Sequence, residues 1–237
     1  MLNQSVVVDA ELFGSAKDRI LAVACDGLGS CKGSDEASFA AICSMRDACK
    51  QKQDPISLCM ALHRADDNVR KKQSESKELA SIKTTIAVLY VDEEGFLAYN
   101  AGDTRIYHYN NGVLEQLSVD HTLSDDLQVL GESCERFNEG NNTCNQNIIT
   151  QFLGSHRGQL KPYIAGDISS TASYGTFLLC TDGAYKGVPD EKIAEVLGYP
   201  AITLEQKGQL LYGLAEASGV RDNISLILVS VEEGVLE

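Results

Sequence analysis

Residues 84–117 read TTIAVLYVDEEGFLAYNAGDTRIYHYNNGVLEQL, and they indicate the class of fold more clearly than any other segment. The stretch holds four short runs rich in β-branched and aromatic residues, which are typical of strands. Turn-forming residues separate the runs, and the Asn-Asn-Gly of residues 110–112 is a strong hairpin signal. The stretch therefore predicts an antiparallel meander with strands at residues 84–91, 96–101, 105–109 and 113–117.

Helical and strand patterns flank this meander on both sides. Residues 20–25 form a continuous apolar run that fits a buried strand. Ser34, followed by two acidic residues, fits the cap of a helix. Asp54-Pro55 is typical of a helix start, because Asp caps the free N–H groups and Pro fits the first turn. Further along the chain, we predict strands at residues 148–152, 163–168, 176–180 and 224–231, and helices at residues 190–197 and 204–218.

This order of elements suits an α+β layered domain better than a regular βαβ alternation. The chain has 237 residues, enough for a sizeable core, and we expect one domain over residues 1–237. Residues 123–147 are polar, with weak periodicity. We interpret them as a mobile, flap-like surface segment, and a disordered insertion is the open alternative.

Composition argues against several classes of function. The formal net charge of −14 disfavours nucleic acid or an anionic membrane as the main partner, since both require a basic face. No apolar run reaches about 18 residues and no signal peptide is visible, so we expect a cytoplasmic protein without a membrane span. Eight cysteines are present without a Cys-x-x-C pair. Half of them lie in apolar patterns, which favours reduced thiols over disulfides: Cys25, Cys43, Cys59 and Cys180.

Four aspartates share one local context, the end of a predicted strand. Asp26, Asp103 and Asp182 each come within two residues after a strand, and Asp222 comes two residues before the last one. Each aspartate on its own is better interpreted as a turn residue. Together, converging carboxylates would repel one another and raise their own pKa values. Hard divalent cations such as Mg²⁺ or Mn²⁺ relieve that repulsion and prefer oxygen ligands, so the set indicates a metal site.

The glycine-rich loop after Asp26 has rival interpretations. A phosphate-binding P-loop requires its lysine after the second glycine, but Lys32 precedes Gly33. A calcium-binding EF-hand that starts at Asp26 would have Leu28 and Ala37 where oxygen ligands are needed. A dinucleotide-binding fingerprint is a weak match, because Gly33 falls one residue late. A nucleotide-binding protein built on this loop is therefore the least favoured hypothesis.

Seven segments, in order along almost the whole chain, resemble the metal-dependent protein phosphatase family (PPM, protein phosphatase 2C-like). Their order and spacing carry the resemblance, because any one of them alone would be a weak match. The segments are AVACDGLGS at 22–30, DEASFAA at 35–41, KTTIAVLYV at 83–91, AGDTRIYHYNNGVLEQLSVDHT at 101–122, NIITQFLGS at 147–155, FLLCTDGAYKGVPDEKI at 177–193 and RDNISLILVSV at 221–231.

The resemblance implies an αββα sandwich of two antiparallel sheets flanked by helices, with two Mn²⁺ or Mg²⁺ ions at one end. It implies that Asp26 bridges the ions, that Gly27 offers its backbone carbonyl to one of them, and that two further aspartates hold the other: Asp182 and Asp222. Asp103, with Asp182, matches the acids that hold a third, weaker ion in bacterial members.

The implied activity is hydrolysis of phosphoserine and phosphothreonine in proteins by a metal-activated water, without a nucleophilic side chain. The implied partners are a phosphorylated protein substrate and a Ser/Thr kinase with its targets. We expect the chain to act as a monomer.

The chain also departs from the family pattern. Family members usually carry an arginine a few residues before an Asn-Gln/Glu-Asp triplet, whereas this chain has Asn3-Gln4-Ser5 and no arginine before it. Lys83 stands where the family has the glycine of Gly-Thr-Thr, and Leu28 replaces a histidine of some eukaryotic members. Ser5 and the missing arginine bear on phosphate binding and on one metal position. They leave open a second hypothesis, a weakened or silent phosphatase homologue that acts as a binding or regulatory module.

Overall fold

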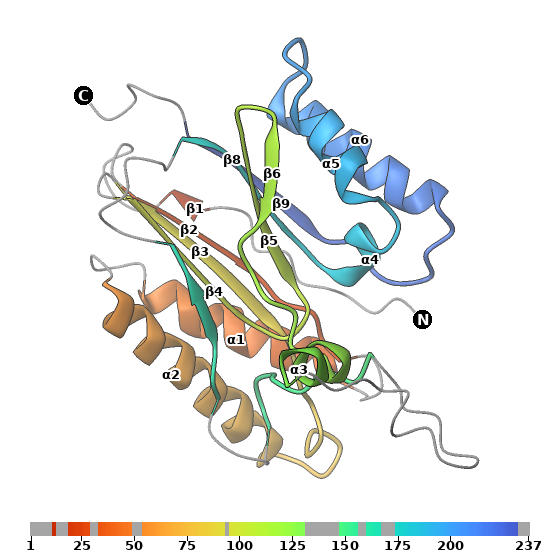
Figure 1. Cartoon of the computed structure of the whole chain (residues 1–237). Helices are drawn as coiled ribbons and strands as arrows, with labels where there is room; N and C mark the ends of the chain where they lie inside the picture. Colours follow the sequence, from red (N-terminus) through yellow and green to blue (C-terminus); the bar gives the residue numbers. More distant parts are fainter. Residues whose placement is uncertain are drawn as a thin grey trace.

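The computed structural model describes residues 11–12, 19–28, 33–48, 54–92, 95–130, 147–155, 160–166 and 174–231. Two antiparallel sheets pack against each other, and helices cover their outer faces (Figure 1). The five-stranded sheet has the order β1 (Glu11–Leu12), β2 (Arg19–Ala24), β3 (Ile86–Asp92), β4 (Gly95–Ala101) and β7 (Tyr163–Ala165). The four-stranded sheet has the order β6 (Val113–Gln116), β5 (Arg105–Asn110), β8 (Gly175–Cys180) and β9 (Leu226–Val231).

Each sheet has its own set of helices. The five-stranded sheet packs against α1 (Ser34–Ala48) and α2 (Pro55–Gln73). The four-stranded sheet packs against α4 (Asp182–Tyr185), α5 (Asp190–Leu197) and α6 (Leu204–Ala217) (Figure 1). This layering confirms the expected α+β fold and αββα sandwich. No helix in the described part of the chain combines the length and apolar character needed to cross a membrane.

Alternation along the strands distributes side chains among three apolar layers. In β2, Val23 packs toward α1 and α2, whereas Ala24 faces the second sheet. In β8, Leu179 faces the first sheet, whereas Leu178 packs under α5 and α6. This follows because successive side chains of a strand point to opposite faces. Each fully buried aliphatic side chain contributes about 1.5–3 kcal/mol, so these layers are the main favourable term in folding.

Local capping sets where two of the helices begin. The Asp54 side chain accepts a hydrogen bond from the Ser57 N–H at 2.8 Å, and Pro55 occupies the first turn, as predicted. At the start of α6, the Thr203 hydroxyl accepts from the Gln206 N–H at 3.2 Å. The Gln206 side chain accepts in return from the Thr203 N–H at 2.9 Å. Such caps satisfy N–H groups that a helix leaves unpaired at its start.

The predicted meander is wrong in one respect, because its four strands belong to two sheets. β3 pairs with β4 and β5 pairs with β6, but β4 and β5 have different partners. The chain crosses between the sheets at Gly102, whose φ of 112° is rarely adopted by residues with a side chain. A Cβ there would lie 2.5 Å from the Thr85 side chain. This crossing places Asp103 at the junction of the two sheets.

The segment 123–147, expected to be a flap, begins with a helix, α3 (Leu123–Val129). Thr122 caps it, because its hydroxyl accepts from the Asp125 N–H at 3.3 Å. Residues 131–146 of this segment lie outside the described residues. The strand predicted at residues 148–152 is instead irregular, with one bridge from Ile149 to Thr122.

Candidate metal centre

Strand pairing in the five-stranded sheet brings Asp26 and Asp103 to the same end. β2 runs antiparallel to β3, so Asp26, which follows β2, lies beside the start of β3. The first residue of β3, Ile86, is opposite the last residue of β4, Ala101. Asp103 follows that residue by two positions. Both aspartates therefore lie at the end of the sheet where β3 begins.

Strand pairing in the four-stranded sheet does the same for Asp182 and Asp222. The last residue of β8, Cys180, is opposite the first residue of β9, Leu226. Asp182 lies two residues after β8, and Asp222 lies in the loop that leads into β9. The end of β8 also pairs with the start of β5, Arg105, two residues after Asp103, which places this end of the sheet beside the first pair of aspartates.

Two threonines at the start of β3 hold the backbone of Asp26. The Thr84 hydroxyl donates to the Asp26 carbonyl at 3.0 Å, and the Asp26 N–H donates to the Thr85 hydroxyl at 3.0 Å. Both threonines are completely buried. The next residue, Gly27, forms a bridge with Thr84. A Cβ on Gly27 would lie 2.7 Å from the Ser34 carbonyl oxygen, so only glycine lets this loop pass the start of α1.

A contact between two hydroxyl groups joins the two sheets at this end. The Thr85 hydroxyl lies 2.5 Å from the hydroxyl of Thr104, the residue after Asp103. Because Thr85 also accepts from the Asp26 N–H, two buried side chains connect the backbone of Asp26 to Thr104, the neighbour of Asp103. The distance between the Asp26 and Asp103 carboxylates therefore depends on a contact between the two sheets.

The turn before Asp103 is held by residues from two other segments. The His121 N–H donates to the Gly102 carbonyl at 3.0 Å, and the Gly102 N–H donates to His121 Nδ1 at 3.3 Å. The Asn100 amide adds a hydrogen bond to the same carbonyl at 3.2 Å. Burial lowers the pKa of His121, which favours the neutral ring that can accept from Gly102. These contacts fix where Asp103 emerges from the sheet.

Asp182 is the first residue of α4, and the loop that carries Asp222 packs directly against it. A Cβ on Gly183 would lie 2.2 Å from the carbonyl oxygen of the Asp222–Asn223 turn, so glycine is required for this approach. The Thr181 N–H donates to the Ser225 carbonyl at 3.1 Å, and the Ser225 N–H donates to the Thr181 hydroxyl at 3.1 Å. The Asp222 residue itself is exposed, whereas Asp182 is partly buried.

The pKa shifts of two aspartates indicate that the four carboxylates lie close to one another. Burial first, then the charges of the three other aspartates and a hydrogen-bond contact with Asp182, raises the pKa of Asp26 to about 8. Burial and then the charge of Asp182 raise the pKa of Asp103 to about 6, although Lys186 lowers it. Charges act on one another only at short range, since water and salt screen them beyond about 10 Å. The structure therefore brings all four predicted aspartates into one region.

The chemistry of this region suits a hard divalent cation. Asp182 accepts a hydrogen bond from Lys186 Nζ through Oδ2 at 2.6 Å. Its other oxygen, Oδ1, is buried and receives no hydrogen bond from an N–H or hydroxyl group in the described part of the chain, although the Asp26 carboxyl is a hydrogen-bond contact of Asp182. A buried oxygen without a partner costs free energy, and a cation would remove that cost.

The carboxylates of the described residues do not form a complete ligand shell for a metal ion. Among the residues that the structure describes, no three His, Cys, Asp or Glu side chains are arranged as a ready metal-binding group. Like charges repel, whereas a cation would draw them together. The assignment of Asp26, Gly27, Asp103, Asp182 and Asp222 as metal ligands thus stays a prediction.

A second polar network, centred on Arg105, lies beside the aspartates. Its guanidinium pairs with Asp120, with a closest distance of 2.7 Å, and donates to the Tyr107 hydroxyl at 2.8 Å. It also stacks over the Tyr185 ring, 3.8 Å from the centroid. The Tyr107 hydroxyl donates to Asp190 at 3.0 Å, at the start of α5. The network ties β5 to α4 and α5, and so supports the short helix that begins with Asp182.

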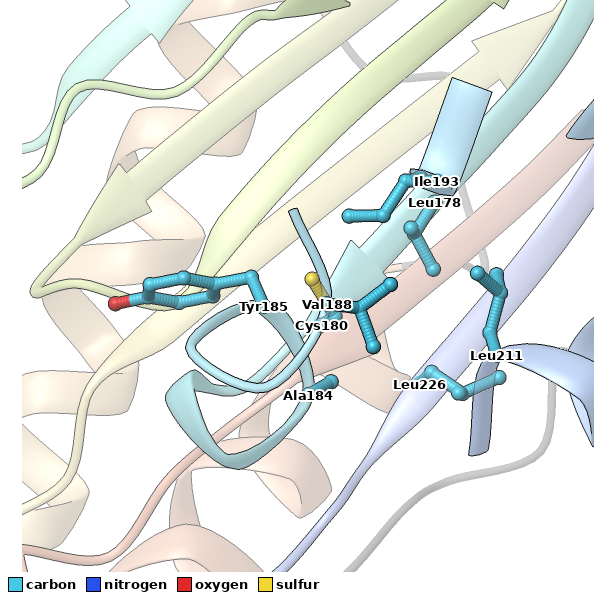
Figure 2. A pocket seen from close by; sticks show the side chains of 8 residues that line it. All are labelled: Leu178, Cys180, Ala184, Tyr185, Val188, Ile193, Leu211 and Leu226. Carbon is cyan, nitrogen blue, oxygen red and sulfur yellow. The ribbon is translucent and has the colours of Figure 1, made fainter. Parts of the chain in front are cut away.

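An apolar cavity of about 10 Å³ lies behind α4. Figure 2 shows its lining side chains, which come from β8, β9, the three helices of that layer and, with Val188, the segment between α4 and α5. The cavity is too small for a substrate, and its lining is almost entirely apolar. It is therefore a gap in the packing of this layer and not a second binding site.

The sequence analysis named the four aspartates as candidate ligands, but it did not identify the residues that position them. Lys186 could have been found, because it lies four residues after Asp182 at the spacing of an i,i+4 helical ion pair. The contact between Thr85 and Thr104 has no sequence signal, since it joins different sheets. Residues 3–5, where this chain departs from the family triplet, lie outside the described residues.

Comparison with known proteins agrees with this fold. The serine/threonine phosphatase stp of Listeria monocytogenes serotype 4b is 28% identical over 225 residues, which cover 92% of this chain and 87% of that protein. The solved structure of the serine/threonine phosphatase Stp1 from Staphylococcus aureus matches with a TM-score of 0.76 at 23% identity, over 97% of this chain and 94% of that one.

The catalytic domain of the serine threonine protein phosphatase PstP, solved in complex with 2 manganese ions, matches with a TM-score of 0.73 at 19% identity, over 98% of this chain and 94% of that one. These likenesses to solved structures show the shared fold. The family model described as Protein phosphatase 2C matches residues 3–216, which is most of the chain. The chain therefore belongs to the protein phosphatase 2C family.

Proposed function

We propose that the chain is a metal-dependent phosphatase that hydrolyses phosphoserine and phosphothreonine in proteins. The observation that carries the proposal is the convergence of three carboxylates, those of Asp103, Asp182 and Asp222, on Asp26 from the ends of both sheets. The family assignment and the similarity to serine/threonine phosphatases support it. Carboxylate clusters of this kind suit Mg²⁺ or Mn²⁺, which relieve their mutual repulsion.

Three aspartates and one backbone carbonyl would hold two divalent ions. Asp26 would bridge them, Gly27 would offer its carbonyl to one, and two aspartates from the second sheet would hold the other: Asp182 and Asp222. When bound, such ions supply an activated water for in-line attack on phosphorus and neutralise the phosphoryl oxygens. The chain's own part is to hold these ligands in place, which the threonine contacts at Asp26 and the Gly183 contact at Asp182 do.

The proposed activity implies particular partners, and the cysteines bear on the compartment. The substrate is a phosphorylated protein, and the opposing enzyme is a Ser/Thr kinase that acts on the same targets. The four cysteines in the described part of the chain are free thiols, and such thiols persist in a reducing compartment. We therefore place the protein in the cytoplasm.

A phosphopeptide assay with and without Mn²⁺ tests the proposal. We expect phosphate release from phosphoserine and phosphothreonine peptides that requires Mn²⁺ and falls about 100-fold or more in Asp182→Asn. The matched control is Asp67→Asn, because Asp67 is exposed on α2, and its activity should equal that of the wild type. Activity that persists after chelation, or in Asp182→Asn, would contradict the proposed mechanism.

A second candidate is a homologue that binds metal and a phosphoprotein without turnover. Ser5 favours it, because this position carries an aspartate that serves metal binding in the family. Calorimetry that shows Mn²⁺ binding in a protein without phosphopeptide turnover would support this candidate. Robust turnover in the same preparation would exclude it.

A further inference from the structure

Lys186 places a positive charge directly on the carboxylate cluster. Its Nζ donates to Asp182 Oδ2 at 2.6 Å. Asp182 begins α4 and Lys186 follows it by four residues, so the helix carries both side chains on one face. The Lys186 N–H also donates to the Asp182 carbonyl at 3.0 Å, which closes the turn. A Cβ on the next residue, Gly187, would lie 2.4 Å from the Ser218 hydroxyl, so the end of α4 is held against α6.

The other aspartates sense this ammonium as well. Partial burial lowers the pKa of Lys186, but its hydrogen bond to Asp182 and the surrounding carboxylate charges outweigh burial and raise it. Those charges include Asp103 and Asp222. In return, Lys186 lowers the pKa of Asp103. The lysine is therefore a cation shared by the cluster and not only one half of a surface ion pair.

The two oxygens of Asp182 have different surroundings. Oδ2 is taken by the ammonium, whereas Oδ1 is buried and receives no hydrogen bond from an N–H or hydroxyl group in the described part of the chain, with the Asp26 carboxyl in contact with Asp182. The ammonium acts on the carboxylate of Asp103, so a divalent ion shared by Asp103 and Asp182 would have to approach it closely, whereas the ion that Asp182 shares with Asp26 and Asp222 would use Oδ1. Like charges at that distance repel each other, although solvent reduces the repulsion because the Lys186 side chain is 46% exposed.

We propose that Lys186 is a built-in cation of the cluster that takes the place of a third divalent ion beside Asp103 and Asp182, so that the chain binds two such ions and not three. The inference rests on the proposed function, in which Asp26, Asp182 and Asp222 hold two ions. It replaces the expectation that Asp103 holds a third ion with a specific role for a lysine.

Counting Mn²⁺ ions in variants of the full chain tests this inference. After chelation and dialysis, we expect titration calorimetry and metal analysis to find two Mn²⁺ per wild-type chain and three in Lys186→Met. Lys186→Arg keeps the charge and should bind two. The matched control is Lys192→Met, because Lys192 also pairs with an acid on its own helix, Glu195 at 2.7 Å, and should bind two.

Stability in chelator gives a readout that needs neither metal nor activity. Without Mn²⁺, Lys186→Met should melt about 3 °C below Lys192→Met, because it leaves Asp182 among like charges. Saturating Mn²⁺ should remove that difference. Lys186→Gln repeats both measurements if the methionine variant does not fold.

Three outcomes would overturn the inference. A wild type that binds three Mn²⁺ would refute the inference and leave the proposed function standing. A Lys186→Met protein that binds two Mn²⁺ and melts with Lys192→Met would do the same. A wild type that binds no Mn²⁺ would refute the proposed function and the inference together.

Discussion

The first prediction is that replacing Asp26 by asparagine stabilises the metal-free protein while it abolishes metal binding. Burial and the three neighbouring carboxylates raise the pKa of Asp26 to about 8, so the charged side chain is unfavourable in the fold. Asparagine has nearly the same shape, carries no charge and can donate a hydrogen bond to Asp182. Removing a buried, repelled charge should therefore raise the free energy of unfolding when no divalent ion is present.

The magnitude follows from the pKa of Asp26 in the folded and unfolded states. Below pH 4, both states hold the proton and Asp26 contributes nothing. Between pH 4 and pH 8 the unfolded chain releases the proton and the fold keeps it, so the destabilisation grows as pH rises. Because pH 7 lies about three pH units above the pKa of Asp in the unfolded chain, and the folded-state pKa is higher still, the upper limit at pH 7 is about 4 kcal/mol. Because Asp26 keeps some contact with water, we expect a gain of about 2 kcal/mol at pH 7 and under about 1 kcal/mol at pH 5.

Urea unfolding in chelator, followed by circular dichroism because the chain has no tryptophan, measures this gain. The control is Asp67→Asn on the exposed face of α2, which should match the wild type at both pH values. With Mn²⁺ added, the order should reverse, since only the wild type gains stability from the ions. An Asp26→Asn protein that is no more stable than the wild type at pH 7 in chelator, or whose gain does not grow with pH, would refute this reasoning.

The remaining predictions concern the groups around the cluster. Gly183→Ala should weaken Mn²⁺ affinity about 10-fold or more in calorimetry, because its Cβ would lie 2.2 Å from the Asn223 carbonyl, whereas Gly213→Ala has no atom within 4 Å and should leave affinity unchanged. Thr85→Val should lower the free energy of unfolding by about 1–3 kcal/mol in urea, because it leaves the buried Asp26 N–H without its acceptor. Burial raises the pKa of the Cys180 thiol to about 12, so at pH 8 it should react with a thiol reagent only after denaturation, and rapid labelling of the native protein would count against its buried position.

Much of the fold could be predicted because its signals are local. The Asn-Asn-Gly turn of residues 110–112 and the cap at Asp54 act within a few residues, and both appear where the sequence places them. The sequence could not show which side chains of β2 face the helices and which face the second sheet. Residues 20–25 are apolar throughout, and they contribute side chains to two different apolar layers. The meander failed at Gly102 for a related reason, because which sheet a strand joins depends on partners far along the chain.

The candidate site divides in the same way. Local sequence patterns are enough to show which carboxylates stand at strand ends and that oxygen ligands suit a hard divalent ion. The packing of the two sheets was needed to show that Asp26 meets the aspartates of the second sheet, that two threonine hydroxyls join the sheets beside it, and that Lys186 binds one oxygen of Asp182. The physical reason is that strand and helix propensities act over a few residues, whereas the repulsion of four acidic groups and its relief by a cation depend on distances that exist only after both sheets have packed.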